Sequence, residues 1–341
     1  MVTDPTADPT VGELSEGAIL RRILARTGVA DASLVGPGDD AAVLASTGPI
    51  VATTDTLVHG PDFRLAWSRG FDLGWKSAAV NLADVAAMGA RPTALLVALA
   101  MPDSTRISFV EQLADGLRAA CDQLAPGCAV VGGDLTVSQT LTIAVTALGS
   151  LPGAPILRSG AQEGDIVAVA GDLGLAARGL AVLFDRATDD AGHPIAYDES
   201  LVQTLTVPER EAVGVQLRPS PPIAAGLIAA GAGAHSMMDV SDGLVLDATR
   251  MADASGVTID VNSALVSALT GESDAQRLRE ALTGGEDHAL LATFAPDSVP
   301  VGFREIGVVR ARGEHAVLVD SVVYDGRGGW DPYRDWDTQT G

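Results

Sequence analysis

The sequence predicts a mixed α+β protein that is divided into two domains. Three observations support this prediction. First, the 341 residues exceed the roughly 100–150 residues of a common single domain. Second, apolar residues at helical spacing alternate along the chain with short apolar runs typical of strands. Third, residues 151–165 gather proline, glycine and turn-forming residues, which indicates a domain boundary near the middle of the chain.

We therefore expect an N-terminal domain over residues 13–150 and a C-terminal domain over residues 151–341. The first 12 residues are acidic, contain proline and lack an apolar segment, so we expect them to form a disordered leader. The composition, 47% hydrophobic and 19% charged with 38 glycines, is typical of an ordered protein with many tight turns.

The spacing of apolar residues predicts the elements of the N-terminal domain. Helices are expected over residues 13–28, 72–88 and 107–124, where glycine ends the first and follows the second. Strands are expected over residues 41–44, 50–54, 93–102, 128–134 and 141–151.

The C-terminal domain is expected to begin with a strand at residues 166–171 and a helix near 173–183. An irregular acidic stretch reaches residue 198, and a helix is expected over 223–230. Residues 235–261 have the pattern of a strand, an acidic turn, a helix and a strand. A strand near 305–309, a hairpin and a tail complete the chain.

The charge balance excludes some partners and favours others. With 44 acidic and 22 basic residues, the formal net charge is −22, which would repel nucleic acid and an anionic membrane surface. Lys76 is the only lysine. Any phosphate group must therefore be held by arginine, backbone amides or metal ions, and acidic pockets that hold divalent cations become plausible.

Cysteine use and hydropathy predict a cytoplasmic protein. Cys121 and Cys128 are too few for a disulfide framework and do not match a zinc pattern. The N-terminus has no apolar core of a signal peptide, and the longest apolar runs fall short of the ~20 residues of a membrane span.

Acidic residues cluster at the edges of five predicted elements. The clusters are "GDDAA" with Asp39 and Asp40, "TTDT" with Thr53, Thr54 and Asp55, "NLAD" with Asp84, "GGD" with Asp134, and "DVSDG" with Asp239 and Asp242. Each cluster alone is typical of a turn or a helix cap. Asp84 differs because it lies inside an apolar helix, where a buried carboxylate needs an ion pair, with Lys76 two turns away, or a metal ion.

Oxygen ligands in this number suit Mg²⁺, which takes its remaining ligands from water and phosphates. The scattered histidines and cysteines form no transition-metal site, and "DVSDG" lacks the pattern of an EF-hand. The P-loop, the Rossmann fingerprint and the protein-kinase catalytic loop are absent. Nucleotide binding would therefore use a rarer fold.

The motifs resemble, in their order, those of the thiamine-monophosphate kinase family, within the superfamily that includes aminoimidazole ribonucleotide synthetase and selenophosphate synthetase. The resemblance covers roughly residues 13–336. It rests on "GPGDDAAVL", "TTDTLV", "DLGWKSAAVNLADVAAMGARP", "VVGGDLT", "LRSGAQEGD", "MDVSDGL" and "GGEDHAL".

The resemblance implies a set of site residues. The implied magnesium ligands are Asp40, Thr53, Thr54, Asp55, Asp84, Asp134, Asp239 and Asp242. The implied ATP contacts are Gly133, Asp134, Arg158 and Ser241. Asp39 is expected to shape the turn beside Asp40. The resemblance thus makes the N-terminal domain the ATP and magnesium domain.

The resemblance also implies a site for thiamine phosphate, to which the C-terminal domain contributes. Glu286 and Trp330 match the acceptor positions, and an aromatic ring suits the cationic thiazolium. Asp62 stands where the family often has a histidine, and His59 lies three residues earlier, so this contact is open. His288 replaces a common tyrosine, and "GGDLTVS" lacks a frequent Thr-Arg.

The implied activity is in-line transfer of the γ-phosphoryl group of ATP to thiamine phosphate, assisted by several Mg²⁺ ions. The implied fold is an N-terminal α/β domain that forms a β-barrel across a homodimer, followed by a C-terminal α/β domain. An aminoimidazole ribonucleotide synthetase-like enzyme and a non-catalytic magnesium-nucleotide-binding protein remain alternatives. Selenophosphate synthetase and a hydrogenase-maturation enzyme are disfavoured because neither end of the chain carries the cysteine that each requires.

Overall fold

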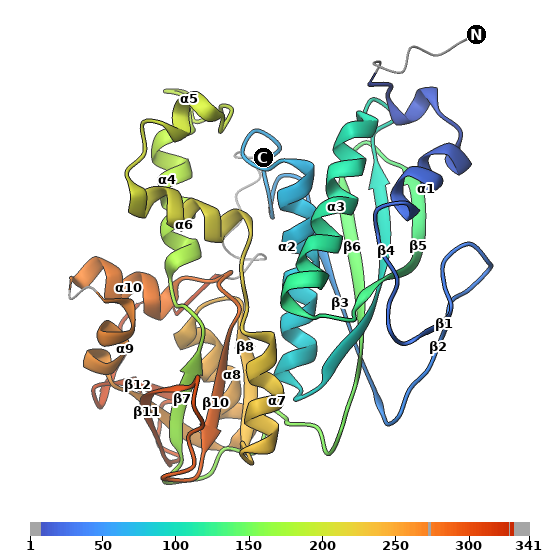
Figure 1. Cartoon of the computed structure of the whole chain (residues 1–341). Helices are drawn as coiled ribbons and strands as arrows, with labels where there is room; N and C mark the ends of the chain where they lie inside the picture. The colour runs from blue at the N-terminus through green and yellow to red at the C-terminus, as the bar shows by residue number, and fades with distance from the viewer. Residues whose placement is uncertain (1–7, 272–273, 327, 331–341) are drawn as a thin grey trace.

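The computed structural model describes residues 8–271, 274–326 and 328–330. The chain forms two main β-sheets with helices between and around them, as Figure 1 shows. Residues 151–165, between the last strand of the first sheet and the first strand of the second, contain no helix or strand.

The N-terminal half contains a four-stranded sheet and two long helices. Its elements are η1 (Val11–Glu13), α1 (Glu16–Leu24), β1 (Ser33–Val35), β2 (Val43–Leu44), β3 (Ile50–Val58), α2 (Gly70–Ala87), β4 (Arg91–Met101), α3 (Ile107–Leu124), β5 (Ala129–Val137) and β6 (Thr142–Ser150). The sheet has the order β3-β6-β4-β5, so β3 and β5 are its edges. Strands β1 and β2 pair separately as a small hairpin.

Helices α2 and α3 run parallel and approach closely through glycines. A Cβ atom at Gly74 would lie 2.0 Å from the carbonyl oxygen of Leu113, and one at Gly116 would lie 2.1 Å from that of Phe71. Only a residue without a side chain lets the two backbones come this near. The pair covers one face of the sheet, where Leu95, Ile143 and Val145 are buried.

The C-terminal half is built on a seven-stranded sheet of the order β13-β12-β9-β11-β7-β10-β8. Its neighbouring strands are antiparallel except β12 and β9, which are parallel. Its elements are β7 (Ile166–Ala170), α4 (Leu175–Arg186), α5 (Glu199–Val202), α6 (Val207–Leu217), α7 (Ile223–Gly231), β8 (Ser236–Val240), α8 (Leu244–Ser255), β9 (Val257–Val261), α9 (Ser263–Thr270), α10 (Ala275–Thr283), β10 (Ala289–Phe294), β11 (Arg304–Ala311), β12 (Val317–Val319) and β13 (Val322–Val323).

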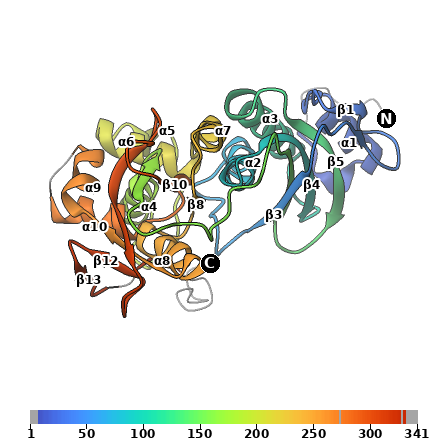
Figure 2. The ribbon, with the colours of Figure 1, turned by 90° about the horizontal axis from the view of Figure 1, so that it is seen from below.

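Helix α2 lies between the two halves. In Figures 1 and 2 it has α3 on one side and α7 with β8 on the other. Alanines such as Ala79, Ala83 and Ala86 share one apolar core with Met237 and Leu290 of the second sheet. A Cβ at Gly226 of α7 would lie 2.2 Å from the carbonyl oxygen of Ala86. The two halves therefore share a core along α2.

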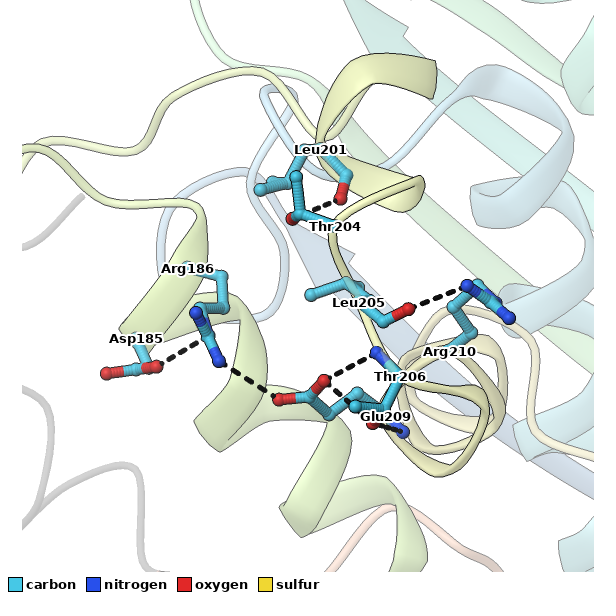
Figure 3. Close-up of polar contacts among 8 residues, drawn as sticks. All are labelled: Asp185, Arg186, Leu201, Thr204, Leu205, Thr206, Glu209 and Arg210. Atoms are coloured by element: carbon cyan, nitrogen blue, oxygen red, sulfur yellow. Dashed lines mark hydrogen bonds and ion pairs between the residues drawn. The ribbon is translucent and has the colours of Figure 1, made fainter.

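Helices α4 and α6 form a separate helical layer beside this core. Thr206 and Glu209 form a reciprocal cap at the start of α6, in which Glu209 accepts hydrogen bonds from the Thr206 backbone N–H (2.7 Å) and hydroxyl (2.8 Å). Arg186 of α4 then contacts the second oxygen of Glu209 at 3.4 Å. Figure 3 shows this junction. The cap fixes where α6 begins, and α6 carries Gln216 to the site described below.

Most of the predicted elements are present, with three differences. Strand β3 continues to Val58, beyond the predicted end at residue 54. Helices α5, α6, α9 and α10 and strands β1 and β10 were not predicted. The expectation of a disordered leader over residues 1–12 is wrong for residues 8–12, because Val11 is buried and the Asp8 carboxylate accepts hydrogen bonds from Ser108 at the start of α3. Residues 1–7 lie outside the described residues.

Within the part of the chain that the structure describes, no helix is both long enough and apolar enough to cross a membrane.

The glycine contacts predict that replacing Gly74 by alanine destabilises the protein, although alanine has the higher helix propensity. Gly74→Ala is expected to lower the free energy of unfolding by about 3 kcal/mol, because the new methyl group would overlap the backbone of α3. Gly214→Ala in α6 has nothing within 4 Å of its added Cβ and is expected to raise that free energy by about 0.5–1 kcal/mol. Urea unfolding of both variants is the measurement; destabilisation of equal size in both would contradict the packing argument.

Candidate active site

Two polar residues of the N-terminal half meet across the helix-facing side of the sheet. Thr53 on β3 donates a hydrogen bond from its hydroxyl to Oδ2 of Asp84 on α2, at 2.8 Å. Because side chains alternate along a strand, Thr53 and Asp55 face α2 while Thr54 faces the other side. The Asp84 carboxylate is therefore held at the surface of α2 that also faces the C-terminal half.

The end of β8 brings Asp239 near Asp84. Burial raises the pKa of Asp84 to about 6, and the charges of Asp239 and Asp55 add to this rise, while the hydrogen bond from Thr53 opposes it. Asp239 is 4% exposed, and one of its oxygens lies 3.1 Å from Nδ1 of His288. Carboxylates from both halves thus repel one another in a site with limited access to water.

Asp55 belongs to the same group of charges. Partial burial raises the pKa of Asp55, and the charges of Asp239 and Asp242 raise it further, while a hydrogen bond from the backbone N–H of Thr56 and the charge of His288 lower it. Asp55, Asp84 and Asp239 are therefore three mutually interacting carboxylates contributed by β3, α2 and β8. We refer to these three residues as the carboxylate cluster.

Three segments that are distant in sequence meet beside the carboxylate cluster through backbone hydrogen bonds. Glu286 N–H donates to the carbonyl of Ser241 at 2.8 Å, His288 N–H to that of Val240 at 3.2 Å, and Trp330 N–H to that of Asp242 at 2.9 Å. These bonds place the "DVSDG", "GGED" and "GGW" motifs together. Ser241, Asp242, Glu286 and Trp330 thus lie in one part of the C-terminal half.

The Asp242 side chain is held by the protein itself. Its Oδ2 lies 2.5 Å from Arg250, which also contacts Asp247 at 2.6 Å. Asp247 accepts the backbone N–H of Asp242 at 3.0 Å, and burial raises the pKa of Asp247 to about 6. Asp242 therefore shares its charge with an arginine, unlike the members of the carboxylate cluster.

A second polar group lies further along α2. Nζ of Lys76 lies 2.9 Å from Oε1 of Glu286 and donates to the carbonyl of Gln216 at 3.2 Å. Gln216 donates from Nε2 to Oε2 of Glu286 at 2.5 Å. The partner of Lys76 is therefore Glu286, whereas Asp84, which the sequence offered as one possibility, bonds to Thr53.

Asp62, and not His59, faces this second group. Burial raises the pKa of Asp62, a hydrogen bond from the backbone N–H of Val58 opposes this, and the charge of Glu286 raises the pKa further. The His59 ring instead contacts Phe63 and lines a cavity of 670 Å³ at the N-terminal ends of α2 and α3. Of the two candidates for the family's histidine position, Asp62 is the one near Glu286.

Several predicted site residues lie away from the carboxylate cluster. The Thr54 hydroxyl faces the opposite side of the sheet, where it donates to the carbonyl of Val145 and accepts from Thr146. Asp40 lies in the loop between β1 and β2, and both views place this hairpin on the side away from the C-terminal half (Figures 1 and 2). Within this single chain, these two side chains do not join Asp84.

Gly133 and Asp134 are also separated from the cluster. Both lie on β5, the sheet edge opposite to β3, which is about 14 Å away at the usual strand spacing. The register pairs Asp134 with Ala98, which places it on the same open face as Thr54. Gly133 also has a structural reason to be glycine, since a Cβ would lie 1.9 Å from the carbonyl oxygen of Val97.

Arg158 lies in the link between the two sheets. Its carbonyl accepts a hydrogen bond from Ser255 at the end of α8 (3.0 Å), and the adjacent Leu157 carbonyl accepts one from Met237 at the start of β8 (3.1 Å). Arg158 is exposed and lies toward the opposite end of β8 from Asp239.

Four residues that hold this site together are not among the predicted site residues, although the sequence offers Lys76 as a possible ion-pair partner of Asp84. Gln216, Lys76 and His288 contact Glu286 or Asp239, and Asp287 accepts the backbone N–H groups of Gly174 (2.7 Å) and Ala176 (2.8 Å) at the start of α4. Burial raises the pKa of Asp287 to about 7. The signal for Lys76 was its uniqueness in the chain, whereas Gln216 lies in a helix that was not predicted.

The donor set of the carboxylate cluster suits a hard cation. Among residues 8–271, 274–326 and 328–330, no three acidic, histidine or cysteine side chains converge as a complete metal site. Carboxylates beside a threonine hydroxyl are nevertheless the oxygen ligands that Mg²⁺ prefers, and a cation would relieve the repulsion that raises the pKa of Asp84. These residues therefore fit Mg²⁺ as part of its ligand shell, and water and nucleotide phosphates would supply the remaining ligands.

Burial of the Asp84 carboxylate beside other carboxylates costs stability. Replacing Asp84 by a neutral residue is therefore expected to stabilise the protein. A carboxylate with a raised pKa destabilises the folded protein above that pKa and stops doing so as the pH falls toward its ordinary value. In protein without added metal, Asp84→Asn is therefore expected to raise the free energy of unfolding by about 1–3 kcal/mol at pH 8. The gain should shrink between about pH 6 and pH 4 in urea titrations; a loss of stability at pH 8 would contradict the argument.

The chain is similar to known proteins along nearly its whole length. A family model described as "AIR synthase related protein, N-terminal domain" matches residues 38–151. Thiamine-monophosphate kinase of Mycobacterium tuberculosis (strain ATCC 25618 / H37Rv) is 39% identical over 343 residues, which cover 98% of this chain and 96% of that protein.

Two solved structures extend the likeness to the fold. Thiamine-monophosphate kinase from Stenotrophomonas maltophilia K279a has a TM-score of 0.74 and 35% identity, covering 91% of this chain and 98% of that one. AaThiL complexed with AMPPCP and TMP has a TM-score of 0.70 and 29% identity, covering 93% and 97%. These findings confirm the resemblance predicted from the motifs. The chain belongs to the thiamine-monophosphate kinase family.

Proposed function

We propose that this protein transfers the γ-phosphoryl group of ATP to thiamine phosphate and so forms thiamine diphosphate and ADP. The observation that carries the proposal is the carboxylate cluster, Asp55, Asp84 and Asp239. The two halves of the chain both contribute to it, and it lies next to Glu286 and its partner Lys76. The AaThiL structure, which contains AMPPCP, an ATP analogue, and TMP, supports the same pair of reactants.

The reaction needs positioning and charge neutralisation more than proton transfer. A terminal oxygen of thiamine phosphate forms a bond to the γ-phosphorus while the bond from that phosphorus to the β-phosphate oxygen breaks, and ADP leaves. The acceptor oxygen is already anionic near neutral pH. A general base is therefore not required, which agrees with a cluster made of carboxylates.

Mg²⁺ ions would supply the charge that this acidic protein lacks. They would be held by Asp55, Asp84 and Asp239 with the Thr53 hydroxyl, and they would neutralise the phosphates of both reactants. The protein's own part is to hold these oxygens in place: Thr53 orients Asp84, and His288 contacts Asp239. Asp242 would join them only if it exchanged Arg250 for the metal.

The acceptor would bind beside Glu286, Asp62 and Trp330. The carboxylates of Glu286 and Asp62 favour the positively charged thiazolium ring, and the half-exposed Trp330 side chain (44%) offers an aromatic face. Ser241 is a proposed contact of ATP, whereas Arg158 stays a prediction from the resemblance, because it lies toward the opposite end of β8 from Asp239. The backbone bonds between Ser241 and Glu286 would then keep the two reactants next to each other.

We also propose that two copies of the chain pair through the open face of the four-stranded sheet. This face carries Ile50 (62% exposed) and Leu96 (38% exposed), and its strand positions alternate between small, apolar and threonine side chains. Its described strand positions carry two charged residues, Asp134 on β5 and Arg91 at the start of β4, which the register pairs with Ser150 beside Ile50. An exposed sheet face with so little charge, with open edges at β3 and β5, is typical of a protein interface.

Such pairing would complete the site. A two-fold axis would bring the β5 edge of one copy against the β3 edge of the other, as in a closed barrel. Asp134 on β5, and Asp40 in the hairpin that packs beside β5 through Ala42 and Leu44, would then approach the partner's carboxylate cluster. We therefore propose that Asp40, Gly133 and Asp134 serve the site of the partner copy.

Turnover tests the carboxylate cluster. Asp84→Asn and Asp55→Asn are each expected to lower kcat for thiamine phosphate by about 100-fold or more, because stabilisation of charge in the transition state is lost. The measurement is ADP release with Mg²⁺, ATP and thiamine phosphate. Asp253→Asn, which changes an exposed ion pair with Arg312, is the matched control and should keep full activity. Near-normal turnover of Asp84→Asn would refute the assignment.

Complementation tests the shared site. Asp84→Asn and Asp134→Asn are each expected to be inactive, yet their mixture should regain about a quarter of wild-type activity after subunit exchange. Half of the dimers would then be mixed, and each mixed dimer would have one intact site. Light scattering should give twice the 34.7 kDa chain mass. A monomeric active enzyme, or a mixture that stays inactive although exchange is demonstrated, would contradict the proposal.

A further inference from the structure

Lys76 is the only lysine of the chain, and it lies where a lysine is costly. Its side chain is 5% exposed on α2, the helix between the two halves. A buried ammonium group requires partners that compensate for the loss of water. Lys76 has two such partners, the carboxylate of Glu286 at 2.9 Å and the carbonyl of Gln216 at 3.2 Å.

Glu286 is held at both oxygens by groups from different halves of the chain. Lys76 of α2 contacts Oε1, and Gln216 of α6 donates to Oε2 at 2.5 Å. Burial raises the pKa of Glu286, but the charge and hydrogen bond of Lys76 and the hydrogen bond from Gln216 outweigh it and lower that pKa. Glu286 therefore stays a carboxylate whose direction is fixed by two donors.

The backbone at Glu286 has a strained conformation beside these contacts. Its φ angle is +70°, in the left-handed region that residues with a Cβ atom rarely adopt. Such strain persists where the surrounding contacts over-determine the conformation, and it is concentrated at functional sites. The preceding Gly285 is constrained by space, since a Cβ there would lie 2.2 Å from the carbonyl oxygen of Ser241.

The Lys76 charge also reduces the net negative charge beside the proposed acceptor site. Glu286 and Asp62 are both carboxylates and repel each other, and Lys76 attracts both. The three residues together carry one net negative charge, which matches a single thiazolium cation. About a third of the Glu286 side chain (35%) remains exposed and so accessible to a ligand.

We propose that Lys76 and Gln216 are positioning residues that hold the Glu286 carboxylate toward the cationic ring of the acceptor. The inference rests on the proposed function and adds two residues that make the same site specific for a cationic acceptor. It assigns them no contact with the transferred phosphoryl group. Buried ion pairs seldom add net stability over apolar residues of similar size, so stability alone does not account for a lysine here.

The proposal is tested by comparing the two Michaelis constants. Lys76→Met and Gln216→Met are each expected to raise KM for thiamine phosphate by about 10- to 100-fold, the effect of losing a hydrogen bond to a charged group. KM for ATP and kcat should change less than about twofold, because the carboxylate cluster is untouched. Lys76→Arg, which keeps the charge, should recover part of the loss.

Two variants elsewhere in the chain serve as matched controls. Gln276→Met removes a glutamine that contacts a glutamate on α10 at 3.0 Å, and Arg310→Met removes a cation that contacts the buried Asp260 at 2.7 Å. Both should leave both Michaelis constants unchanged. Equal increases in both constants for Lys76→Met, or an unchanged constant for thiamine phosphate in the folded variant, would overturn the proposal.

The single lysine allows a direct measurement on the unmodified protein. With ¹⁵N-labelled lysine, Nζ of Lys76 gives one side-chain amine signal, which should shift on addition of thiamine phosphate and not on addition of AMPPCP with Mg²⁺. A signal that does not shift on addition of thiamine phosphate would overturn the proposal even if Lys76→Met does not fold. Absence of wild-type turnover would instead refute the proposed function, so the two failures are distinguishable.

Discussion

The burial of α2 between the two sheets determines where the polar groups of the site can lie. Sixteen residues of this helix are buried, and small side chains let α3 and α7 approach its backbone from either side. A helix enclosed in this way offers no solvated face to its polar residues. Ser77 and Asn81 donate hydrogen bonds to carbonyls of α2 itself, whereas Lys76 and Asp84 take partners from other elements, and these partners define the site.

Two polar residues of α2 use this position differently. Asp84 bonds to Thr53 of the N-terminal sheet and faces Asp239 of the C-terminal sheet, which leaves a concentration of negative charge. Lys76, two turns earlier, pairs with Glu286 and offsets the negative charge of that carboxylate. One helix thus separates a region suited to cations and phosphates from a region suited to a cationic organic ring. The two regions are adjacent, as the proposed transfer between two substrates would require.

Much of this arrangement could be predicted from the sequence, and the exceptions have physical reasons. Asp84 was identified because a carboxylate in an apolar helix needs a partner. Thr53 and Thr54 were both expected to be ligands, yet strand alternation allows only one of two neighbours to face α2. The partner of Lys76 could not be predicted, since Glu286 lies 210 positions later in the chain and meets it only through the tertiary fold.

The separation of Asp40 and Asp134 from the cluster is the other feature that the sequence could not predict. Motif order along the chain contains no information on which sheet edge a strand occupies, and the order β3-β6-β4-β5 places β5 opposite to β3. The nearly uncharged open face of the same sheet suggests a solution, since a second copy would bring the two edges together.

Metal binding at the carboxylate cluster is tested most directly by locating metal ions in crystals grown with Mn²⁺, AMPPCP and thiamine phosphate. Anomalous peaks are expected about 2–2.5 Å from the carboxylates of Asp84 and Asp239, so that one cation site joins α2 to β8. Metal peaks that lie elsewhere, with both carboxylates unliganded in a crystal that contains both substrates, would contradict the claim that the buried helix places Asp84 for cation binding.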